Sequence, residues 1–316
     1  DLYPITIAFI ARLPPSFSGY GTRFVSINIL RCAITASKLD NYPRFKNRRS
    51  FSVASIKLTA VSAFSLNLND HMPLKKLVFL GSKPVGYQCF SYLLEHQSHL
   101  GIEIVGLLTR LRKEFGDGND LTQLAEAHNI PVLKSLSELP KCDILYSVQY
   151  HEILKPGHIS KARELAVNLH MAPLPEYRGA NQFTFAILEG KKEFGATIHK
   201  IDSRIDHGDI LFQDRFPIPE NCWVDDLYQL TLRSSVSLFK TTLEKVIIGD
   251  YTATPQQQLE KEHGTSLHYK NEMADLKIID LAWDKEKIER TIRATSMPGF
   301  EPPYFMMDGK KVYMAP

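Results

Sequence analysis

The chain has 316 residues, 44% hydrophobic and 23% charged, which is typical of a globular protein large enough to bury a core without disulfides or metals. The net charge of +3 is uneven, because residues 1–71 hold nine Lys/Arg and three Asp/Glu whereas the remainder is mildly acidic. An acidic body argues against a nucleic-acid partner bound over a large surface. No apolar run reaches the roughly 18 residues of a transmembrane helix, so we expect no membrane partner.

The cysteines Cys32, Cys89, Cys142 and Cys222 lie far apart and form no CxxC pair. This spacing argues against both a metal cluster and a disulfide framework. We therefore predict free, buried thiols, a cytoplasmic location and no metal site.

The first 71 residues differ from the rest, because they contain no methionine and are rich in Ser and Arg. Met72 directly precedes PLKKLVFLGSKPVG, which is typical of a basic lead, a buried strand and a tight turn. Two interpretations fit residues 1–71: a targeting peptide, or non-native sequence joined ahead of the natural start. We favour the second, and predict that this extension packs poorly and takes no part in function.

From residue 74 onward, strand-like apolar runs alternate with segments of helical periodicity. A loop is expected over 110–119, and Asp120 lies near the N-cap of the helix that follows it. The alternation indicates βαβ units and a parallel sheet. The predicted strands are 74–82, 102–109, 130–135, 142–150 and 166–171, and the predicted helices are 84–97 and 120–130.

Beyond residue 171 we predict a helix at 181–190, strands at 194–202 and 209–218, and a long amphipathic helix ending at Gly249. The character changes from about residue 254, where a polar loop precedes a helix at 283–295 and a hairpin around Asp308-Gly309. The predicted fold class is α/β, with a Rossmann-like, mostly parallel sheet. Its catalytic domain would span residues 72–253, with 254–316 as a small C-terminal subdomain.

The turn GSKPVG after the first strand is not a dinucleotide fingerprint. It lacks GxGxxG, and no acidic residue closes a second strand about 20 positions later. A nicotinamide enzyme is therefore disfavoured, although a ligand site beyond the strand ends is still expected, because open parallel sheets bind ligands there.

Asn168 and His170 lie two residues apart on a predicted strand, so their side chains share one face. A carboxamide that stabilises an oxyanion and an imidazole that moves a proton would suit acyl transfer. Asp206, in the loop between two later strands, would raise the basicity of His170 and orient its ring. Each feature alone is more often structural, as a locally bonded pair or a turn cap, and only the combination favours catalysis.

NLHMAPLPEYRGANQ followed by GATIHKIDSRIDHGDIL resembles the signature of the folate-dependent formyltransferase family. The resemblance covers residues 75–316 and implies that Asn168, His170 and Asp206 are the catalytic residues. Any one part of this motif would be weak, whereas the compound motif is highly specific.

Within the family, Met171, the pair Gln182-Phe183 and the C-terminal IRATSMPGFEPPYF are most similar to the sugar-nucleotide N-formyltransferases. This resemblance implies formyl transfer from 10-formyltetrahydrofolate to the amine of a dTDP- or UDP-linked amino sugar, such as a dTDP-3- or 4-amino-dideoxyhexose. Such enzymes serve bacterial surface polysaccharides, including O-antigen and lipopolysaccharide. The likeness also implies a homodimer and no metal or redox cofactor.

Further site residues follow from residue type and from the resemblance. Each of them also has an ordinary structural interpretation: core packing is equally favoured for Tyr150, solvation is the alternative for the charged residues, and hairpin packing is the alternative for the aromatic residues proposed for base stacking. For the folate we assign Gln149, Tyr150, His151, Leu174 and Asp202. For the sugar nucleotide we assign Arg178 and Lys270 to phosphates, Phe300 and Tyr304 to base stacking, and Gln182 to the substrate.

Three alternatives remain. A methionyl-tRNA formyltransferase should carry a basic C-terminal domain, but residues 254–316 hold nine Lys/Arg and ten Asp/Glu, which gives little counterion release on RNA. The glycinamide ribonucleotide branch lacks a C-terminal appendage of this kind. A catalytically inactive binding domain on the same fold is the third, and the intact set of Asn168, His170 and Asp206 argues against it.

Overall fold

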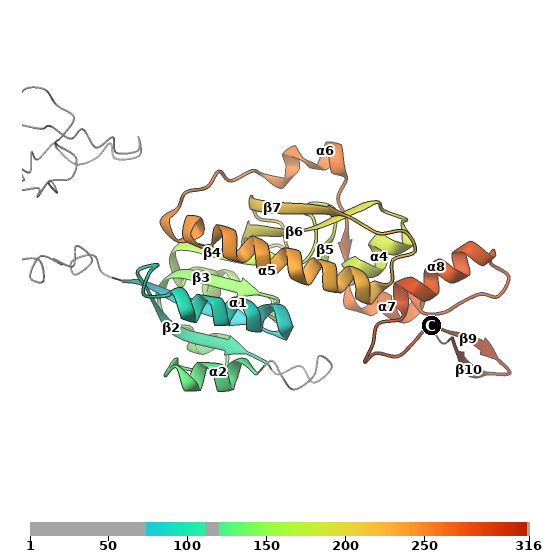
Figure 1. Ribbon diagram of the computed structural model, residues 1–316, viewed down its shortest axis with the longest axis horizontal. Coiled ribbons are helices and arrows are strands. Elements are labelled where there is room, and N and C mark those ends of the chain that lie inside the picture. Colours follow the sequence, from blue (N-terminus) through green and yellow to red (C-terminus); the bar gives the residue numbers. More distant parts are fainter. Residues whose placement is uncertain (1–73, 111–119, 315–316) are drawn as a thin grey trace, which may run out of the picture. The chain divides into compact units, whose positions relative to one another are not determined.

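The computed structural model in Figure 1 describes residues 74–110 and 120–314. The predictions for residues 1–71, for Cys32 and for most of the loop 110–119 lie outside the described residues. The described residues belong to one compact unit.

A six-stranded sheet in the order β2-β1-β3-β4-β6-β7 lies at the centre of this unit. Strands β1 to β4 run parallel, and β6 and β7 are added antiparallel at one side. The predicted α/β class and mostly parallel sheet are thus confirmed. The strands are β1 Lys75–Gly81, β2 Ile102–Thr109, β3 Cys142–Val148, β4 Ala162–His170, β6 Glu193–Lys200 and β7 Ile210–Pro217.

The helices begin and end where local residue chemistry allows. Asp120 accepts hydrogen bonds from the backbone N–H groups of Thr122 and Gln123 and so caps α2, as predicted. Gly249, at φ 80°, takes the left-handed conformation that ends α5. The helices are α1 Lys83–His96, α2 Leu121–Ala127, α3 Pro156–Ile159, α4 Gln182–Leu188, α5 Val224–Ile248, α6 Glu260–His263, α7 Met273–Leu276 and α8 Lys285–Thr295.

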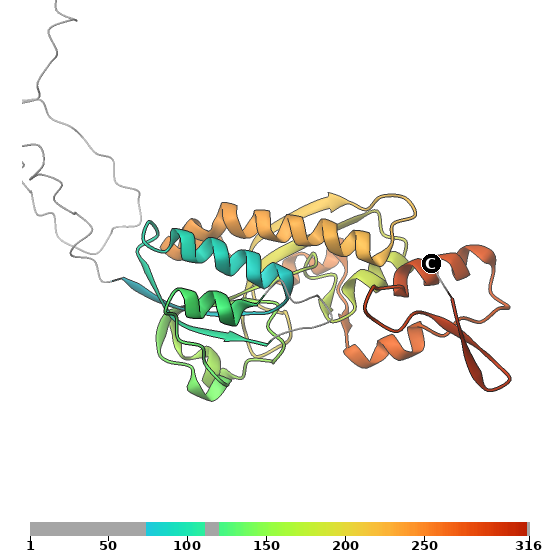
Figure 2. The ribbon, with the colours of Figure 1, turned by 60° about the horizontal axis from the view of Figure 1, so that its bottom comes forward.

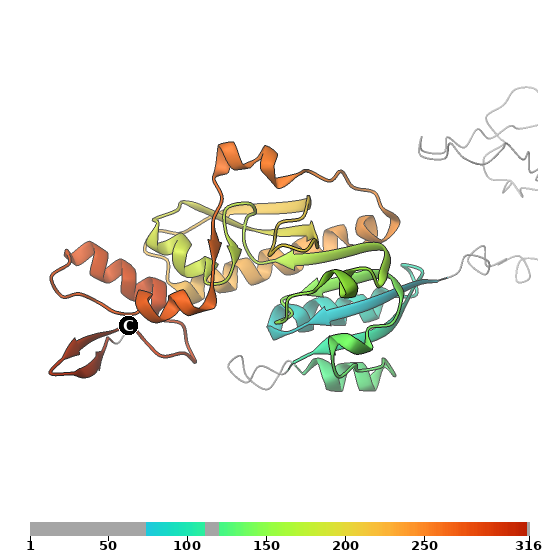
Figure 3. The ribbon, with the colours of Figure 1, turned by 180° about the vertical axis from the view of Figure 1, so that it is seen from behind.

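Strand β1 is buried on both faces of the sheet, which explains its continuous apolar run. On one face Phe79 packs with Phe90 of α1, at a ring-centroid distance of 5.1 Å, and α1 and α5 together cover this face (Figures 1 and 2). On the other face, seen in Figure 3, Leu80 packs in a smaller apolar cluster with Leu136 and Leu154.

Helix α8 and strand β8 (Leu267–His268) are two of the C-terminal elements that are bonded to the rest of the unit. The side chain of Thr184 in α4 donates to the carbonyl of Ala294 in α8, at 2.8 Å. Farther upstream, β8 pairs in parallel with β5 (Arg178–Gly179). The predicted hairpin is confirmed as β9 (Tyr304–Met307) and β10 (Lys310–Tyr313), turning at Asp308 and Gly309, both with positive φ.

The predicted strand at 130–135 was wrong. The structure gives it a single bridge, between Val132 and Leu107 of β2, followed by a 3-10 turn at Leu136–Glu138. The segment therefore runs beside the edge strand for one residue pair only, although its apolar residues resemble those of a strand. The domain division at residue 253 stays a prediction.

Candidate active site

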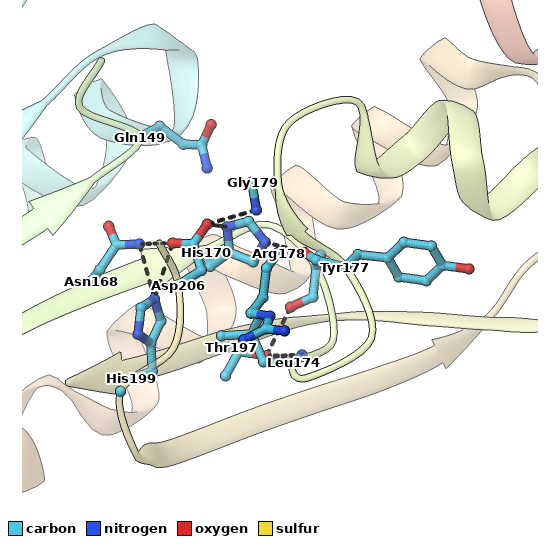
Figure 4. A network of polar contacts seen from close by, with 12 residues as sticks. Gln149, Asn168, His170, Leu174, Tyr177, Arg178, Gly179, Thr197, His199 and Asp206 are labelled. Carbon is cyan, nitrogen blue, oxygen red and sulfur yellow. Dashed lines mark hydrogen bonds and ion pairs between the residues drawn. The ribbon is translucent and has the colours of Figure 1, made fainter. Parts of the chain in front are cut away.

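Strand β4 brings Asn168 and His170 to the carboxyl end of the parallel strands, where the neighbouring strand on one side is β3 and on the other β6. In the antiparallel register with β6, Asn168 lies opposite His199 and His170 lies opposite Thr197. The loop after β6 then returns Asp206 to the same place, so residues 36 or more apart in sequence meet in one cluster (Figure 4).

His170 is buried and its ring is oriented by the backbone. Its Nε2 lies 2.6 Å from the carbonyl oxygen of Tyr177, which can only accept, so Nε2 carries a proton. The other nitrogen, Nδ1, faces Asp206 Oδ2 at 3.6 Å, too long for a hydrogen bond. Burial lowers the pKa of His170, and the nearby carboxylate opposes this shift without cancelling it. The imidazole is therefore poised as a neutral base with Nδ1 as its accepting atom.

Asp206 is held as a carboxylate. Its burial would raise its pKa, but the charge that His170 carries once it is protonated and the hydrogen bonds that the carboxylate accepts, including the one from the Gly179 N–H, outweigh burial and hold the pKa well below its usual range. The Gly179 N–H donates to Oδ2 at 3.0 Å, and Asn168 Nδ2 donates to Oδ1 at 3.4 Å. A proton taken up by His170 would thus form an ion pair with a permanent anion.

His199 belongs to the cluster, and sequence reasoning missed it. Its Nδ1–H donates to the Lys200 carbonyl at 2.8 Å, so Nε2 is an acceptor and receives Asn168 Nδ2–H at 3.1 Å. This bond turns the amide nitrogen of Asn168 toward Asp206. The available signal was the position of His199 in GATIHKIDSRID, the same motif that contains Asp206.

The turn after β4 is fixed by buried polar bonds around Leu174, which precedes a cis peptide bond to Pro175. The Leu174 N–H donates to Thr197 Oγ1 at 3.0 Å, and Gln213 Nε2 donates to the Leu174 carbonyl at 2.8 Å. Both backbone groups of Leu174 are thus bonded inside the protein, and the assignment of this residue to the folate stays a prediction.

The other predicted folate residues lie at the ends of β3 and β6. Gln149 has φ 55° and accepts from Lys83 Nζ at 3.0 Å, and Figure 4 shows it beside the cluster of Asn168 and Asp206. The Tyr150 hydroxyl donates to Glu152 at 2.9 Å, and His151 Nε2 lies 3.4 Å from the same carboxylate. Asp202 accepts from Arg204 N–H and bonds His207 Nδ1 at 3.0 Å.

The predicted sugar-nucleotide residues are more dispersed. The Arg178 guanidinium donates to Thr265 Oγ1 at 2.9 Å, Gln182 is buried in the first turn of α4, and Lys270 is exposed in a short 3-10 turn. Tyr304 is buried in the β9–β10 hairpin with Lys311 Nζ 4.1 Å above its ring, whereas Phe300 is 45% exposed. The arrangement of Tyr304 is that of hairpin packing.

Other features of the described residues concern predictions about metals, thiols and membranes. Cys89, Cys142 and Cys222 are free and buried, as predicted. No group of three or more metal-ligating side chains is found among residues 74–110 and 120–314. In the same residues no helix combines the length and the apolar character needed to cross a membrane.

The segment that contains this cluster resembles known proteins. Residues 114–243 match the sequence profile of the formyl transferase family, and they include Asn168, His170 and Asp206. This part of the chain is thus similar to a formyl transferase domain. Curated relatives include the GDP-perosamine N-formyltransferase of Brucella melitensis, 28% identical over 172 residues, which are 54% of this chain and 64% of the relative. The methionyl-tRNA formyltransferase of Ehrlichia canis is 33% identical over 187 residues, 54% of this chain and 61% of the relative.

The chain therefore spans less than two thirds of the length of either of these relatives. Solved structures with the same fold include a sugar 3N-formyl transferase determined in the presence of dTDP and 5-N-formyl-THF. Its TM-score is 0.62 at 22% identity, and the match covers 76% of this chain and 85% of that one. The N-formyltransferase of Helicobacter canadensis in complex with folinic acid and dTDP-3-aminofucose has a TM-score of 0.62, 23% identity and coverage of 75% and 86%.

Proposed function

We propose that this protein transfers the formyl group of 10-formyltetrahydrofolate to the amine of a nucleotide-linked amino sugar, such as a dTDP-3- or 4-amino-dideoxyhexose. The observation that carries the proposal is the cluster of Asn168, His170 and Asp206, in which a buried neutral imidazole faces a permanent carboxylate inside a formyl transferase domain. This arrangement supplies a base and a charge partner without any redox group.

The amine of the acceptor must be neutral, because its lone pair attacks the formyl carbon. Attack forms a C–N bond and a tetrahedral oxyanion, and the attacking nitrogen becomes cationic. His170 Nδ1 then accepts a proton from that nitrogen, and the resulting imidazolium is stabilised by Asp206 at 3.6 Å. Collapse of the oxyanion breaks the bond to N10 of the folate, which takes up the proton and leaves as tetrahydrofolate.

Asn168 is assigned to the oxyanion, through an amide N–H. In the structure one N–H of Nδ2 is donated to His199 at 3.1 Å and the other to Asp206 at the longer distance of 3.4 Å. The longer contact is the one that an oxyanion would replace, because His199 keeps the carboxamide in the same orientation throughout.

The two substrates are assigned to opposite sides of this cluster. Gln149, Tyr150, His151 and Asp202 lie at the strand ends where a flat pterin would find donors and acceptors, and we propose them for the folate. The exposed side chain of Lys270 and the remaining N–H groups of Arg178 are proposed for the phosphates.

The acceptor class is supported by the solved structures. The fold match extends over 85% of a sugar 3N-formyl transferase determined in the presence of dTDP, and over 86% of an N-formyltransferase in complex with dTDP-3-aminofucose. The 33% identity to a methionyl-tRNA formyltransferase supports the second candidate, transfer to initiator tRNA. The acidic balance of residues 254–316, nine Lys/Arg against ten Asp/Glu, disfavours that candidate.

We further propose a cytoplasmic homodimer that serves surface-polysaccharide synthesis. Three buried free thiols agree with a reducing compartment. The exposed Met306, Met307 and Tyr313 of the C-terminal hairpin offer an apolar surface for a second copy. Light scattering on the purified protein would test the dimer.

The test of function is an incubation of the protein with 10-formyltetrahydrofolate and a panel of dTDP-, UDP- and GDP-linked amino sugars, with initiator methionyl-tRNA alongside. Mass spectrometry would detect the gain of one formyl group. Formylation of a sugar nucleotide that is lost in His170→Ala would support the proposal and name the substrate. Formylated tRNA with unchanged sugars would replace it by the second candidate. No transfer to any acceptor would refute both.

A further inference from the structure

We propose that residues 254–268, which we call the clasp segment, position Asp206 for catalysis, and that Gln256 is the positioning residue within it. The inference rests on the proposed function, because it concerns the geometry of the same reacting cluster. The clasp segment lies outside the matched family region, residues 114–243. It follows α5, includes α6 (Figure 1) and ends with β8.

Gln256 is bonded to the backbone of the loop that carries Asp206. Its side chain is fully buried, and its Nε2 donates both to the Asp206 carbonyl at 2.8 Å and to the Gly208 carbonyl at 2.9 Å. One amide group thus binds two carbonyls on either side of His207. Two bonds from one rigid donor fix the curvature of this loop more tightly than either bond alone could.

The loop conformation needs such support, because it is unfavourable by itself. Asp206 has φ 46°, in the left-handed region that side chains rarely adopt. At Gly208 an added Cβ would lie 2.0 Å from the Lys200 carbonyl oxygen, so the backbone approaches β6 too closely for any side chain. A strained loop retains its shape only where the surrounding structure determines it, and strain of this kind gathers at functional sites.

Gln256 is itself held in place by the sheet. Two residues earlier, Thr254 pairs with Ile210 of β7 through both backbone bonds, at 2.8 and 2.9 Å. The start of the clasp segment is therefore attached to the strand that directly follows the Asp206 loop. The two hydrogen bonds between Thr254 and Ile210 therefore oppose a shift of Gln256.

The other end of the clasp segment fixes the donor that binds the Asp206 carboxylate. Strand β8 pairs with β5, and the carbonyl of His268 accepts the Ala180 N–H at 2.9 Å. Gly179, which pairs with His268, lies between Arg178 and Ala180, and its own N–H donates to Asp206 Oδ2 at 3.0 Å. Gly179 has φ 87°, and an added Cβ would lie 2.2 Å from the His268 carbonyl oxygen, so β5 and β8 are in close contact.

The clasp segment thus binds both the backbone of Asp206, through Gln256, and the group that holds its side chain, through β8. The groups that face the Asp206 carboxylate are His170 and Asn168 from β4, His199 from β6 and the Gly179 N–H from β5. Loss of the two Gln256 bonds would let the carboxylate drift from His170, and a displacement of about 1 Å can cost roughly 100-fold in rate.

The experiment compares Gln256→Met with Gln258→Met in the full chain. Met preserves the length of the side chain and removes the amide donor. Gln258 lies in the same short 3-10 turn, Gln256–Gln258, but its side chain is exposed, which makes it the matched control. Each substitution is also made in an Asp206→Asn background. Thermal unfolding checks that each variant is folded at the assay temperature.

We expect Gln256→Met to lower kcat at least about 30-fold while the KM values for folate and acceptor change less than about threefold. In the Asp206→Asn background the same substitution should add less than about threefold, because its target is already disabled. Gln258→Met should resemble the wild type in both backgrounds. A full, additive loss in the Asp206→Asn background, or wild-type kcat in Gln256→Met, would overturn the proposal. If the Met variant does not fold, Gln256→Asn, which retains a shorter donor, should give an intermediate loss in kcat.

A second readout separates this inference from the proposed acceptor. The titration of His170 by NMR, assigned with a His170→Gln spectrum, needs neither substrate. Because the Asp206 carboxylate raises the pKa of His170, Gln256→Met should move the titration midpoint down and Gln258→Met should not. An unchanged midpoint would overturn the inference, whereas a shifted midpoint in a protein that formylates no sugar would retain it and refute the acceptor alone.

Discussion

Replacing Asp206 with Asn removes one charge and retains the size of the side chain, so it isolates the electrostatic role of this residue. The carboxylate lies 3.6 Å from His170 Nδ1, and the two side chains are only 15% and 4% exposed. At an effective dielectric constant of about 20, unit charges at that distance attract by about 5 kcal/mol. This energy is available only when His170 is protonated, that is, after it has accepted the proton of the attacking amine.

The carboxamide of the variant retains part of that attraction. Its oxygen can still accept the Gly179 N–H that now bonds Oδ2 at 3.0 Å, and this bond keeps the negative end of the amide directed at His170. We therefore take a net loss of about 3 kcal/mol in transition-state stabilisation, which corresponds to roughly 100-fold in kcat. KM for either substrate should change much less, because the ion pair forms only during the reaction.

The assay is formyl transfer to the best acceptor of the panel, followed by mass spectrometry under saturating folate. Asp209→Asn is the control, because Asp209 lies in the same loop but pairs with Lys200 at 3.2 Å with both side chains 39% exposed. Exposed pairs of this kind contribute about 1 kcal/mol or less, so the control should remain within about threefold of the wild type. The reasoning is refuted if Asp206→Asn retains kcat within about threefold, or if both variants lose the same amount.

Three further outcomes are expected. By NMR, His170 should titrate below the 6.5 of an exposed histidine because burial lowers its pKa, and it should titrate lower still in Asp206→Asn. Because the unfolded chain binds this proton more readily than the folded protein, the free energy of unfolding should fall as pH drops through 6.5. Phe239→Ala, at a fully buried position 5.0 Å from the Tyr146 ring, should lose about 3–5 kcal/mol in urea unfolding. Asp120→Ala should lose about 1 kcal/mol in the same assay, since it removes the cap of α2.

Each of these has a result that would count against it. A His170 midpoint above 6.5 would mean that Asp206 outweighs burial, so that less of the histidine would be in its proton-accepting form at neutral pH. A loss below about 1 kcal/mol in Phe239→Ala would mean that the core collapses around the gap. An unchanged Asp120→Ala would place the helix start elsewhere.

The sequence alone was sufficient for features that depend on neighbouring residues. The period of two in β4 places Asn168 and His170 on one face, and the capping chemistry of Asp120 and Gly249 sets helix ends, because these rules act within a few residues. The same local reasoning was wrong at 130–135, because an apolar run becomes a strand only if a partner continues beside it, and here only Val132 finds one.

Only the tertiary structure decided which distant groups complete the cluster. His199 reaches Asn168 because β6 pairs antiparallel with β4, and Gln256 reaches the Asp206 loop, 50 residues earlier, because Thr254 pairs with β7. Neither pairing leaves a periodic trace in the sequence, since backbone hydrogen bonds between strands form with any residue type. The chain thus encodes which side chains can perform the chemistry, whereas strand pairing decides which of them meet.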